Sequence, residues 1–206
     1  MGSIWSQTCS IGRRPPLRGH LKTQAAVVGA GMAGVLTAYA LQQAGLSVVV
    51  LEADRIAGGQ TQNTTAKITS QHGLIYSRLI QSFGEGTARR YAKANQDAVR
   101  AYQDLIDVQG ISCDWEERCA YLYGPDVTVL QEEAEAARRL GLPASFTREV
   151  SIPIPHDGAV CFEGQAQFHP LKFLKVLADQ LTIYEQSRVL TAEGYLLTTE
   201  LGSVQA

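Results

Sequence analysis

The chain has 206 residues, of which 45% are hydrophobic and 18% are charged, and it contains 19 glycines. This length fits one large domain or about one and a half, and the composition excludes a disordered chain, a coiled coil, a collagen-like fibre and a disulfide scaffold. The net charge is −2, so the chain lacks the basic excess that neutralises a phosphate backbone, and we expect no nucleic-acid partner.

The cysteines and one uncharged stretch indicate in which cellular compartment the protein is expected. Cysteines at positions 9, 113, 119 and 161 form no CxxC pair, which favours reduced thiols in the cytoplasm over a zinc site or a disulfide between Cys113 and Cys119. The stretch from Thr23 to Leu51 has no charged residue and follows several basic ones, as in an export signal or membrane anchor. Four glycines interrupt it, and Gln42 and Gln43 lie near its middle, so we expect no membrane span.

The same stretch predicts a strand, a turn and a helix. Gln24 to Val28 is a short apolar run, and apolar residues from Val35 to Leu41 recur with helical spacing before Gly45 ends the helix. Ser47 to Leu51 is uncharged and rich in β-branched residues, which is typical of a strand buried on both faces, and it ends at Glu52. Together these segments predict a βαβ unit.

The turn between the first strand and the helix has the spacing of a dinucleotide site. Gly29 permits the turn, Gly31 lets the backbone approach a pyrophosphate, and Gly34 lets the helix pack closely on the strand. The helix N-terminus offers backbone N–H groups to phosphates, and Glu52 can accept hydrogen bonds from ribose hydroxyls while repelling a 2′-phosphate. A purely structural glycine turn is the alternative.

A second glycine pair follows at Gly58 and Gly59, in a loop rich in hydroxyl and amide side chains that a plain NAD fold does not require. With the first turn and Glu52, this loop resembles the FAD-dependent oxidoreductases of the D-amino-acid oxidase and glycine oxidase superfamily. The segments Thr64–Ile68 and Gln71–Tyr76 look most like bacterial enzymes of the glycine and amine oxidase type. The resemblance extends through Phe168–Pro170 and Tyr184–Val189, and therefore over nearly the whole chain.

The resemblance implies FAD as the cofactor. The residues that it assigns to FAD are Gly29, Ala30, Gly31, Met32, Ala33, Gly34, Glu52, Ala53, Arg55, Gly58, Gly59, Thr61, Thr64, Thr65, Ala66, Lys67 and Val189. In this assignment the first turn meets the pyrophosphate, Glu52 the ribose, Arg55 and the glycine pair the adenine side, and the threonines and Lys67 the stretch toward the flavin. A solvated charge is the alternative for Lys67. We expect flavin to be held without a covalent link to His72 and no metal ligands, and we assign no catalytic residues.

Three further helices are predicted downstream. Apolar residues recur at helical spacing between Gly86 and Gly110 with basic residues near the opposite face, which is typical of an amphipathic surface helix. Val127–Leu140 forms the second helix, and Pro170–Leu181 the third. Because proline suits the first helical position, His169 is interpreted as a residue on the cap side of the third helix rather than as a catalyst.

The predicted strands are short. Ala120–Tyr123 is one, and its tyrosines suit a core or a substrate cavity equally. Tyr184–Val189 is another, and Tyr195–Thr199 with Ser203–Ala206 forms a hairpin. The resemblance implies a further strand beyond Ala206, so we expect a truncated fold whose sheet edge beside Ser203–Ala206 is unpaired and open to self-association.

The fold class is therefore α/β, a three-layer FAD-binding Rossmann-like (GR2-type) fold with an inserted partial substrate domain, truncated at the C-terminus. Residues 1–22 are expected to form a loose N-terminal arm. Residues 23–71 and 172–206 are expected to form an incomplete FAD-binding domain, and residues 72–171 a partial substrate or cap region.

The implied activity is FAD-dependent oxidation of an amine or amino acid, a C–N bond oxidation by hydride transfer to flavin N5. The partner is then a small-molecule amine or amino-acid substrate. Two alternatives remain: a catalytically incomplete FAD-binding fragment, and an NAD-dependent dehydrogenase, which has no use for Gly58 and Gly59.

Overall fold

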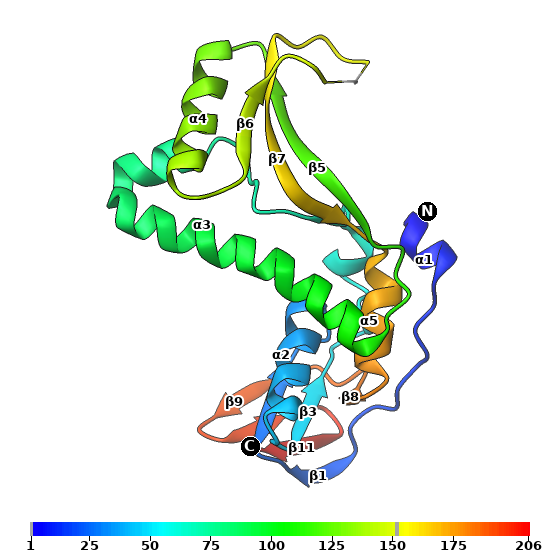
Figure 1. Ribbon diagram of the computed structural model, residues 1–206. Coiled ribbons are helices and arrows are strands. Elements are labelled where there is room, and N and C mark those ends of the chain that lie inside the picture. The colour runs from blue at the N-terminus through cyan, green and yellow to red at the C-terminus, as the bar shows by residue number, and fades with distance from the viewer. Residues whose placement is uncertain (1, 151–152) are drawn as a thin grey trace. The chain divides into compact units, whose positions relative to one another are not determined.

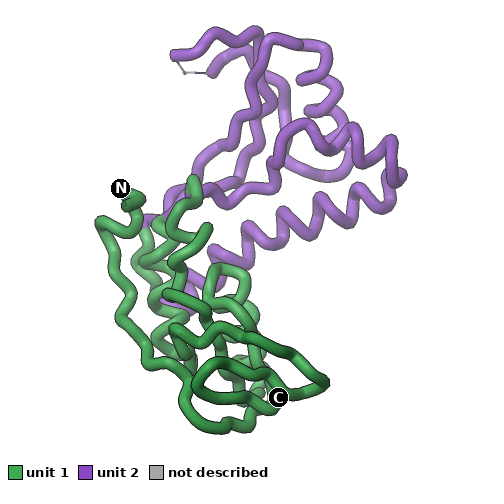
Figure 2. The backbone as a smooth tube through the Cα atoms, turned by 180° about the vertical axis from the view of Figure 1, so that it is seen from behind, with its two compact units in different colours: residues 1–65, 111–113, 169–206 green, residues 66–110, 114–168 purple. Residues whose placement is uncertain are grey.

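The computed structural model describes residues 2–150 and 153–206 (Figure 1). The chain divides into two compact units, shown in Figure 2. Unit 1 comprises residues 1–65, 111–113 and 169–206, and unit 2 comprises residues 66–110 and 114–168. The predicted boundaries differ from these, because residues 1–22 belong to unit 1 and residues 66–71 belong to unit 2.

Unit 1 is built around a parallel sheet of strand order β2-β3-β8. Its strands are β2 (Ala25–Val28), β3 (Val48–Leu51) and β8 (Thr182–Tyr184). All four residues of the central strand β3 are buried, which explains its uncharged, β-branched sequence. Helix α2 (Met32–Gln43) connects β2 with β3 and packs on both strands. The predicted βαβ unit is confirmed.

Two further layers flank this sheet. Helix α5 (Pro170–Ala178) packs beside α2. On the other side lies a second sheet of order β1-β11-β10-β9, formed by β1 (Gly19–Lys22), β11 (Gly202–Gln205), β10 (Leu196–Thr198) and β9 (Thr191–Glu193). Leu17, Val49, Leu51 and Val204 are buried in one cluster between the two sheets, so unit 1 has the predicted three layers.

The expected open edge beside Ser203–Ala206 is wrong. Strand β11 lies inside its sheet, because it pairs in parallel with β1 on one side and antiparallel with β10 on the other. Residues 19–22, which were expected to belong to a loose N-terminal arm, pair with β11 on the side that was expected to be open.

The first residues of the chain are not a loose arm. They contain the short helix α1 (Ile4–Thr8) and end in β1. Ile11 and Leu17 are buried, Leu17 to 2% exposure, and the Leu17 N–H donates to Ser187 Oγ over 2.8 Å. These contacts fix the leader, residues 2–22, to the rest of unit 1.

Unit 2 is an antiparallel sheet covered by helices. Its strand order is β4-β7-β5, with β6 also paired to β7. The strands are β4 (Lys67–Ile68), β5 (Glu116–Gly124), β6 (Ala144–Thr147) and β7 (Gly158–Gln167), and the helices are α3 (Tyr76–Gln109) and α4 (Val127–Arg139). Tyr76, Leu130 and Phe162 belong to its buried core, which joins both helices to the sheet.

Several element boundaries differ from the predicted ones. Element α3 contains two helical segments joined by a kink at Gly84, where φ is 75° and ψ is 158°. The segment after Gly84 runs to Gln109 with Gly110 as its C-cap and matches the helix predicted between Gly86 and Gly110, whereas the segment from Tyr76 to Gly84 was not predicted. The predicted strand Tyr184–Val189 is wrong, because β8 covers Thr182–Tyr184 and the backbone turns at Gln186 with φ 49°. His169 is the N-cap of α5 and its side chain accepts from the Lys172 N–H, as predicted.

Across residues 2–150 and 153–206, no helix combines the length and the apolar character that crossing a bilayer requires.

Candidate functional site

The glycine turn after β2 takes a shape that side chains would block. Gly29 has φ +96°, and its N–H donates to Leu51 O over 2.8 Å. A Cβ on Gly34 would lie 1.8 Å from Gly29 O, so only glycine allows α2 to start this close to the turn. A Cβ on Gly31 would lie 3.4 Å from Thr61 Oγ1. The turn is therefore a cradle of bare backbone.

The N-terminus of α2 faces this turn. Gly31 is its N-cap residue and has no side chain with which to cap the helix. Thr61, in the 3₁₀ helix η1 (Gln60–Asn63), accepts the Met32 N–H at 3.0 Å. Backbone N–H groups and the positive end of a helix dipole form a ready anion site, so this place suits a pyrophosphate.

Glu52 is held in position at the tip of β3. Its Oε2 accepts the Ala30 N–H at 2.7 Å, and its Oε1 accepts the Asp54 N–H at 2.8 Å. Its backbone is fixed as well, because the Glu52 N–H donates to Tyr184 O and the Ser187 N–H donates to Glu52 O, both at 2.8 Å. An ionised carboxylate has about four acceptor positions, so two bonds leave room for ribose hydroxyls.

These features line one cleft of about 470 Å³ in unit 1. Its lining is formed by Val28, Gly29, Gly31, Met32, Ala33, Gly34, Glu52, Arg55, Ala57, Gly58, Gly59, Gln60 and Thr61. The structure therefore brings together ten of the residues that the sequence assigned to FAD. Ala30 lies just behind them, fully buried, and its carbonyl accepts the Ala57 N–H at 2.9 Å.

The remaining predicted residues lie elsewhere. Ala53 follows Glu52 but is not part of the cleft lining that the described residues form. Thr64 and Thr65 are exposed, and the Thr64 carbonyl accepts the Trp5 indole N–H at 2.9 Å. Val189 packs against the core between the two sheets of unit 1.

Ala66 and Lys67 belong to unit 2, where Lys67 is exposed at the start of β4. His72 also belongs to unit 2, is exposed, and lies with Nε2 3.2 Å from Asn95 Oδ1.

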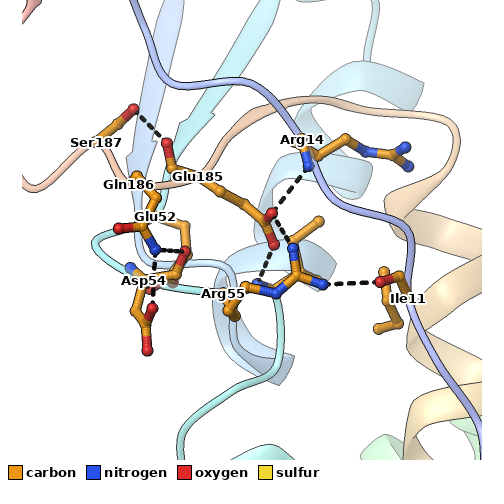
Figure 3. A network of polar contacts seen from close by, with 9 residues as sticks. Ile11, Arg14, Glu52, Asp54, Arg55, Glu185, Gln186 and Ser187 are labelled. Atoms are coloured by element: carbon orange, nitrogen blue, oxygen red, sulfur yellow. Dashed lines mark hydrogen bonds and ion pairs between the residues drawn. The ribbon is translucent and has the colours of Figure 1, made fainter.

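Sequence reasoning missed Glu185, the buried charge of this region (Figure 3). It follows β8 directly, is 2% exposed and forms an ion pair with Arg55. The only available signal was a carboxylate placed directly after an apolar strand, and such a residue is more often solvated than buried.

A smaller space of about 250 Å³, the leader-side hollow, lies between the leader and the loop after β3. Ser6, Cys9, Ser10 and Ile11 line it from the leader, and Asp54 to Gly58 line it from the loop. Burial raises the pKa of the Cys9 thiol against the opposing charges of Lys175 and Lys172. The raised pKa of Cys9 disfavours the thiolate, which is the nucleophilic form.

Comparison with known proteins identifies the family. Residues 24–206 match the DAO family, FAD dependent oxidoreductase. The chain belongs to this family, whose cofactor is FAD, so the predicted family and cofactor are confirmed and the NAD-dependent alternative is set aside.

Two curated relatives illustrate the range of similar proteins. The chain is 36% identical over 193 residues to the putative Rieske 2Fe-2S iron-sulfur protein YhfW of Bacillus subtilis, covering 90% of this chain and 38% of that protein. It is 27% identical over 176 residues to gamma-glutamylputrescine oxidoreductase of Escherichia coli, covering 79% of this chain and 41% of that protein. The chain thus spans less than half the length of either relative.

Solved structures share the fold. L-amino acid deaminase from Proteus myxofaciens superposes with a TM-score of 0.74 at 17% identity, covering 100% of this chain and 47% of that one. Glycine oxidase from Geobacillus kaustophilus superposes with a TM-score of 0.63 at 18% identity, covering 90% of this chain and 54% of that one. The predicted fold class is confirmed.

Proposed function

We propose that the cleft of unit 1 binds FAD and that the chain belongs to an enzyme oxidising an amine or an amino acid at its C–N bond. The observation that carries the proposal is the Glu52 carboxylate, held by two backbone N–H groups beside the bare glycine turn. The names of similar proteins support the substrate class, since they include an oxidoreductase of gamma-glutamylputrescine, an L-amino acid deaminase and a glycine oxidase.

Each part of the cleft has a role in this proposal. The turn from Gly29 to Gly34 brings backbone N–H groups to the pyrophosphate. Glu52 accepts hydrogen bonds from the ribose. Thr61, whose hydroxyl accepts the Met32 N–H, can at the same time donate its own proton to a phosphate oxygen. Bound FAD supplies the redox chemistry by accepting hydride from the substrate carbon that bears nitrogen.

An FAD-binding module without turnover of its own is the second candidate. It is supported by the lining of the cleft, in which Glu52 and Arg55 are the charged residues and both are assigned to the cofactor. Groups that position a substrate against the flavin contribute strongly to rate, and no residue of the cleft is assigned that task.

The electron acceptor is proposed from one relative. YhfW carries a Rieske iron-sulfur name, so we favour an iron-sulfur group over molecular oxygen as the acceptor. Reduced flavin should then reoxidise slowly in air and rapidly with a one-electron acceptor such as ferricyanide. Rapid reoxidation by air would contradict this part of the proposal.

The first test is the visible spectrum of the purified chain, followed by titration of the apo-chain with FAD and, separately, with NAD. We expect yellow protein, saturable FAD binding and no NAD binding. Anaerobic addition of amines and amino acids then separates the two candidates. Bleaching of the flavin by one of them supports the oxidoreductase, whereas flavin that dithionite reduces and no amine bleaches supports the binding module. An apo-chain that binds NAD in place of FAD contradicts both.

A further inference from the structure

The loop after β3 separates two spaces in unit 1. Arg55, Ala57 and Gly58 line the cofactor cleft on one side and the leader-side hollow on the other. A single loop therefore separates the two spaces. We expect the contacts on its leader side to determine the position of the residues on its cleft side. Its conformation includes φ 58° at Ala57, which a non-glycine residue adopts only when its surroundings hold it there.

Glu185 supplies the strongest of these contacts. Its Oε1 accepts the Ile56 N–H at 2.8 Å, and its Oε2 accepts the Arg14 N–H at 2.9 Å and the guanidinium of Arg55 (Figure 3). The second guanidinium nitrogen of Arg55 donates to Ile11 O at 2.9 Å. The planar guanidinium is therefore fixed at two of its nitrogens, so its orientation is fully specified.

Burial makes this arrangement obligatory for the folded chain. A carboxylate that is 2% exposed pays a large desolvation cost, and it is tolerated only with several charge-assisted hydrogen bonds. Glu185 has three, and every one of them reaches either the loop or the leader.

Residues 185–187 also hold the backbone of Glu52, the predicted ribose acceptor. The Ser187 N–H donates to Glu52 O at 2.8 Å, and Gln186 Nε2 donates to Asp54 O at 3.0 Å. Residues 185–187 therefore fix both Glu52 and Arg55, the two charged residues of the cleft lining.

We propose that Glu185 is a positioning residue of the cofactor site, which acts on FAD through Arg55. This inference rests on the proposed FAD site. Glu185 and Ile11 O hold the guanidinium of Arg55 on the leader side of the loop, and Glu185 also holds the Ile56 N–H. These contacts fix the loop whose residues Arg55, Ala57 and Gly58 line the cleft. The leader thus contributes to the cofactor site without touching the cofactor.

The competing explanation is that Glu185 only anchors the leader. Asp179 provides a matched control, because its Oδ1 accepts from the Arg14 guanidinium at 2.6 Å and its Oδ2 accepts from Lys175. Asp179→Asn therefore weakens the attachment of the leader at the same residue, Arg14, and leaves the ion pair of Glu185 with Arg55 in place.

The experiment is a double-mutant cycle on FAD affinity, measured by flavin fluorescence with the whole 206-residue chain. The variants are Glu185→Gln, Arg55→Ala, the double variant and Asp179→Asn, each checked for folding by circular dichroism. We expect Glu185→Gln to weaken FAD binding roughly tenfold when Arg55 is present, the scale of one lost charged hydrogen bond. In the Arg55→Ala background, Glu185→Gln should change the affinity for FAD less than about twofold. Asp179→Asn in the parent chain should also change it less than about twofold.

The outcomes are distinct. An equal loss from Glu185→Gln in both backgrounds, or an equal loss from Asp179→Asn, overturns the positioning role and leaves the FAD site intact. A parent chain that binds no FAD overturns the proposed function and this inference with it. If Glu185→Gln does not fold, Glu185→Asp retains the buried charge but shortens its reach by one methylene, and the same cycle is run with it.

Discussion

Glu133 on α4 binds the backbone of Tyr76 at the start of α3: its Oε1 accepts the Tyr76 N–H at 2.7 Å. The N–H groups on either side donate to the same carboxylate, that of Ile75 at 2.8 Å and that of Ser77 at 2.9 Å. Glu133 is completely buried. A residue of one helix thus caps another, which satisfies donors that a helix cannot satisfy internally.

The first prediction concerns this cap. Glu133→Ala should lower the free energy of unfolding by about 3 kcal/mol, because it leaves three N–H groups unsatisfied at a buried helix end. Denaturant unfolding measures the change. Glu135→Ala is the control on the same helix: the Glu135 side chain is 52% exposed and pairs with Arg138, and such a pair contributes about 0.5 kcal/mol or less. Equal losses in both variants would contradict the capping role.

The second prediction concerns Glu52. Glu52→Arg should weaken FAD binding by about 2–3 kcal/mol, because the ribose loses its charged acceptor and the Ala30 N–H loses its partner. Glu193→Arg makes the same charge change on the exposed strand β9 and should leave affinity unchanged. Titration of the apo-chains with FAD gives both values. An unchanged affinity in Glu52→Arg would remove Glu52 from the site.

The third prediction concerns Gly34. Gly34→Ala should destabilise the chain by about 3 kcal/mol or more and abolish FAD binding, because the new methyl group would lie 1.8 Å from Gly29 O. Gly86→Ala is the opposite case, since Gly86 is helical and a Cβ there meets nothing within 4 Å. The free energy of unfolding of Gly86→Ala should rise by up to about 1 kcal/mol, because alanine has the higher helix propensity. Thermal unfolding compares the two, and a stable, FAD-binding Gly34→Ala would refute the close packing.

The fourth prediction is a pH dependence at Asp179. Burial alone would raise the pKa of this carboxyl, but hydrogen bonds from Lys175 and Arg14 outweigh burial and hold the pKa below its ordinary value of 3.8. A group whose pKa is lowered by folding stabilises the chain above its unfolded-state pKa and loses that contribution as the pH falls through the folded-state pKa. The difference in unfolding free energy between the parent and Asp179→Asn should therefore shrink as the pH is lowered from about 6 to about 3. If this difference in unfolding free energy grew as the pH was lowered, the prediction that folding lowers the pKa of Asp179 would be contradicted.

The fifth prediction concerns the link to flavin. His72 is exposed, with Nε2 3.2 Å from Asn95 Oδ1, and we expect acid precipitation to release all of the flavin into the supernatant. A yellow pellet whose protein mass has risen by one flavin would show a covalent bond. His72→Ala should then abolish the yellow pellet.

The βαβ unit with its glycine turn was predictable from the sequence because each part depends on neighbouring residues. The turn needs glycine at positions 29 and 34 because of the local backbone conformation and packing. Glu52 follows a strand whose uncharged, β-branched composition predicts that it is buried. Ten of the assigned residues meet in one cleft for the same reason, since they lie within one continuous stretch of chain.

The contacts of Glu185 were not predictable in this way. Its partners Arg55 and Arg14 lie 130 and 171 residues away in the sequence, and a hydrogen bond between distant segments leaves no periodic pattern. The leader was misjudged for a related reason. Ile11 and Leu17 are its buried apolar residues, Leu21 is partly buried, and apolar residues this widely spaced show neither helical nor strand periodicity.

The division of unit 1 along the chain has a consequence for biosynthesis. Strand β3 receives β2 as a neighbour within the first 51 residues, but its other neighbour, β8, begins at Thr182. Unit 2 lies almost wholly between them, in residues 66–168. On the ribosome, unit 2 is therefore synthesised before the sheet of unit 1 can close, and the apolar edge of β3 stays unpaired until residues 182–184 emerge. Such long-range pairing slows folding and leaves intermediates exposed to aggregation, so the nascent chain should depend on chaperones most strongly just before residues 182–206 emerge.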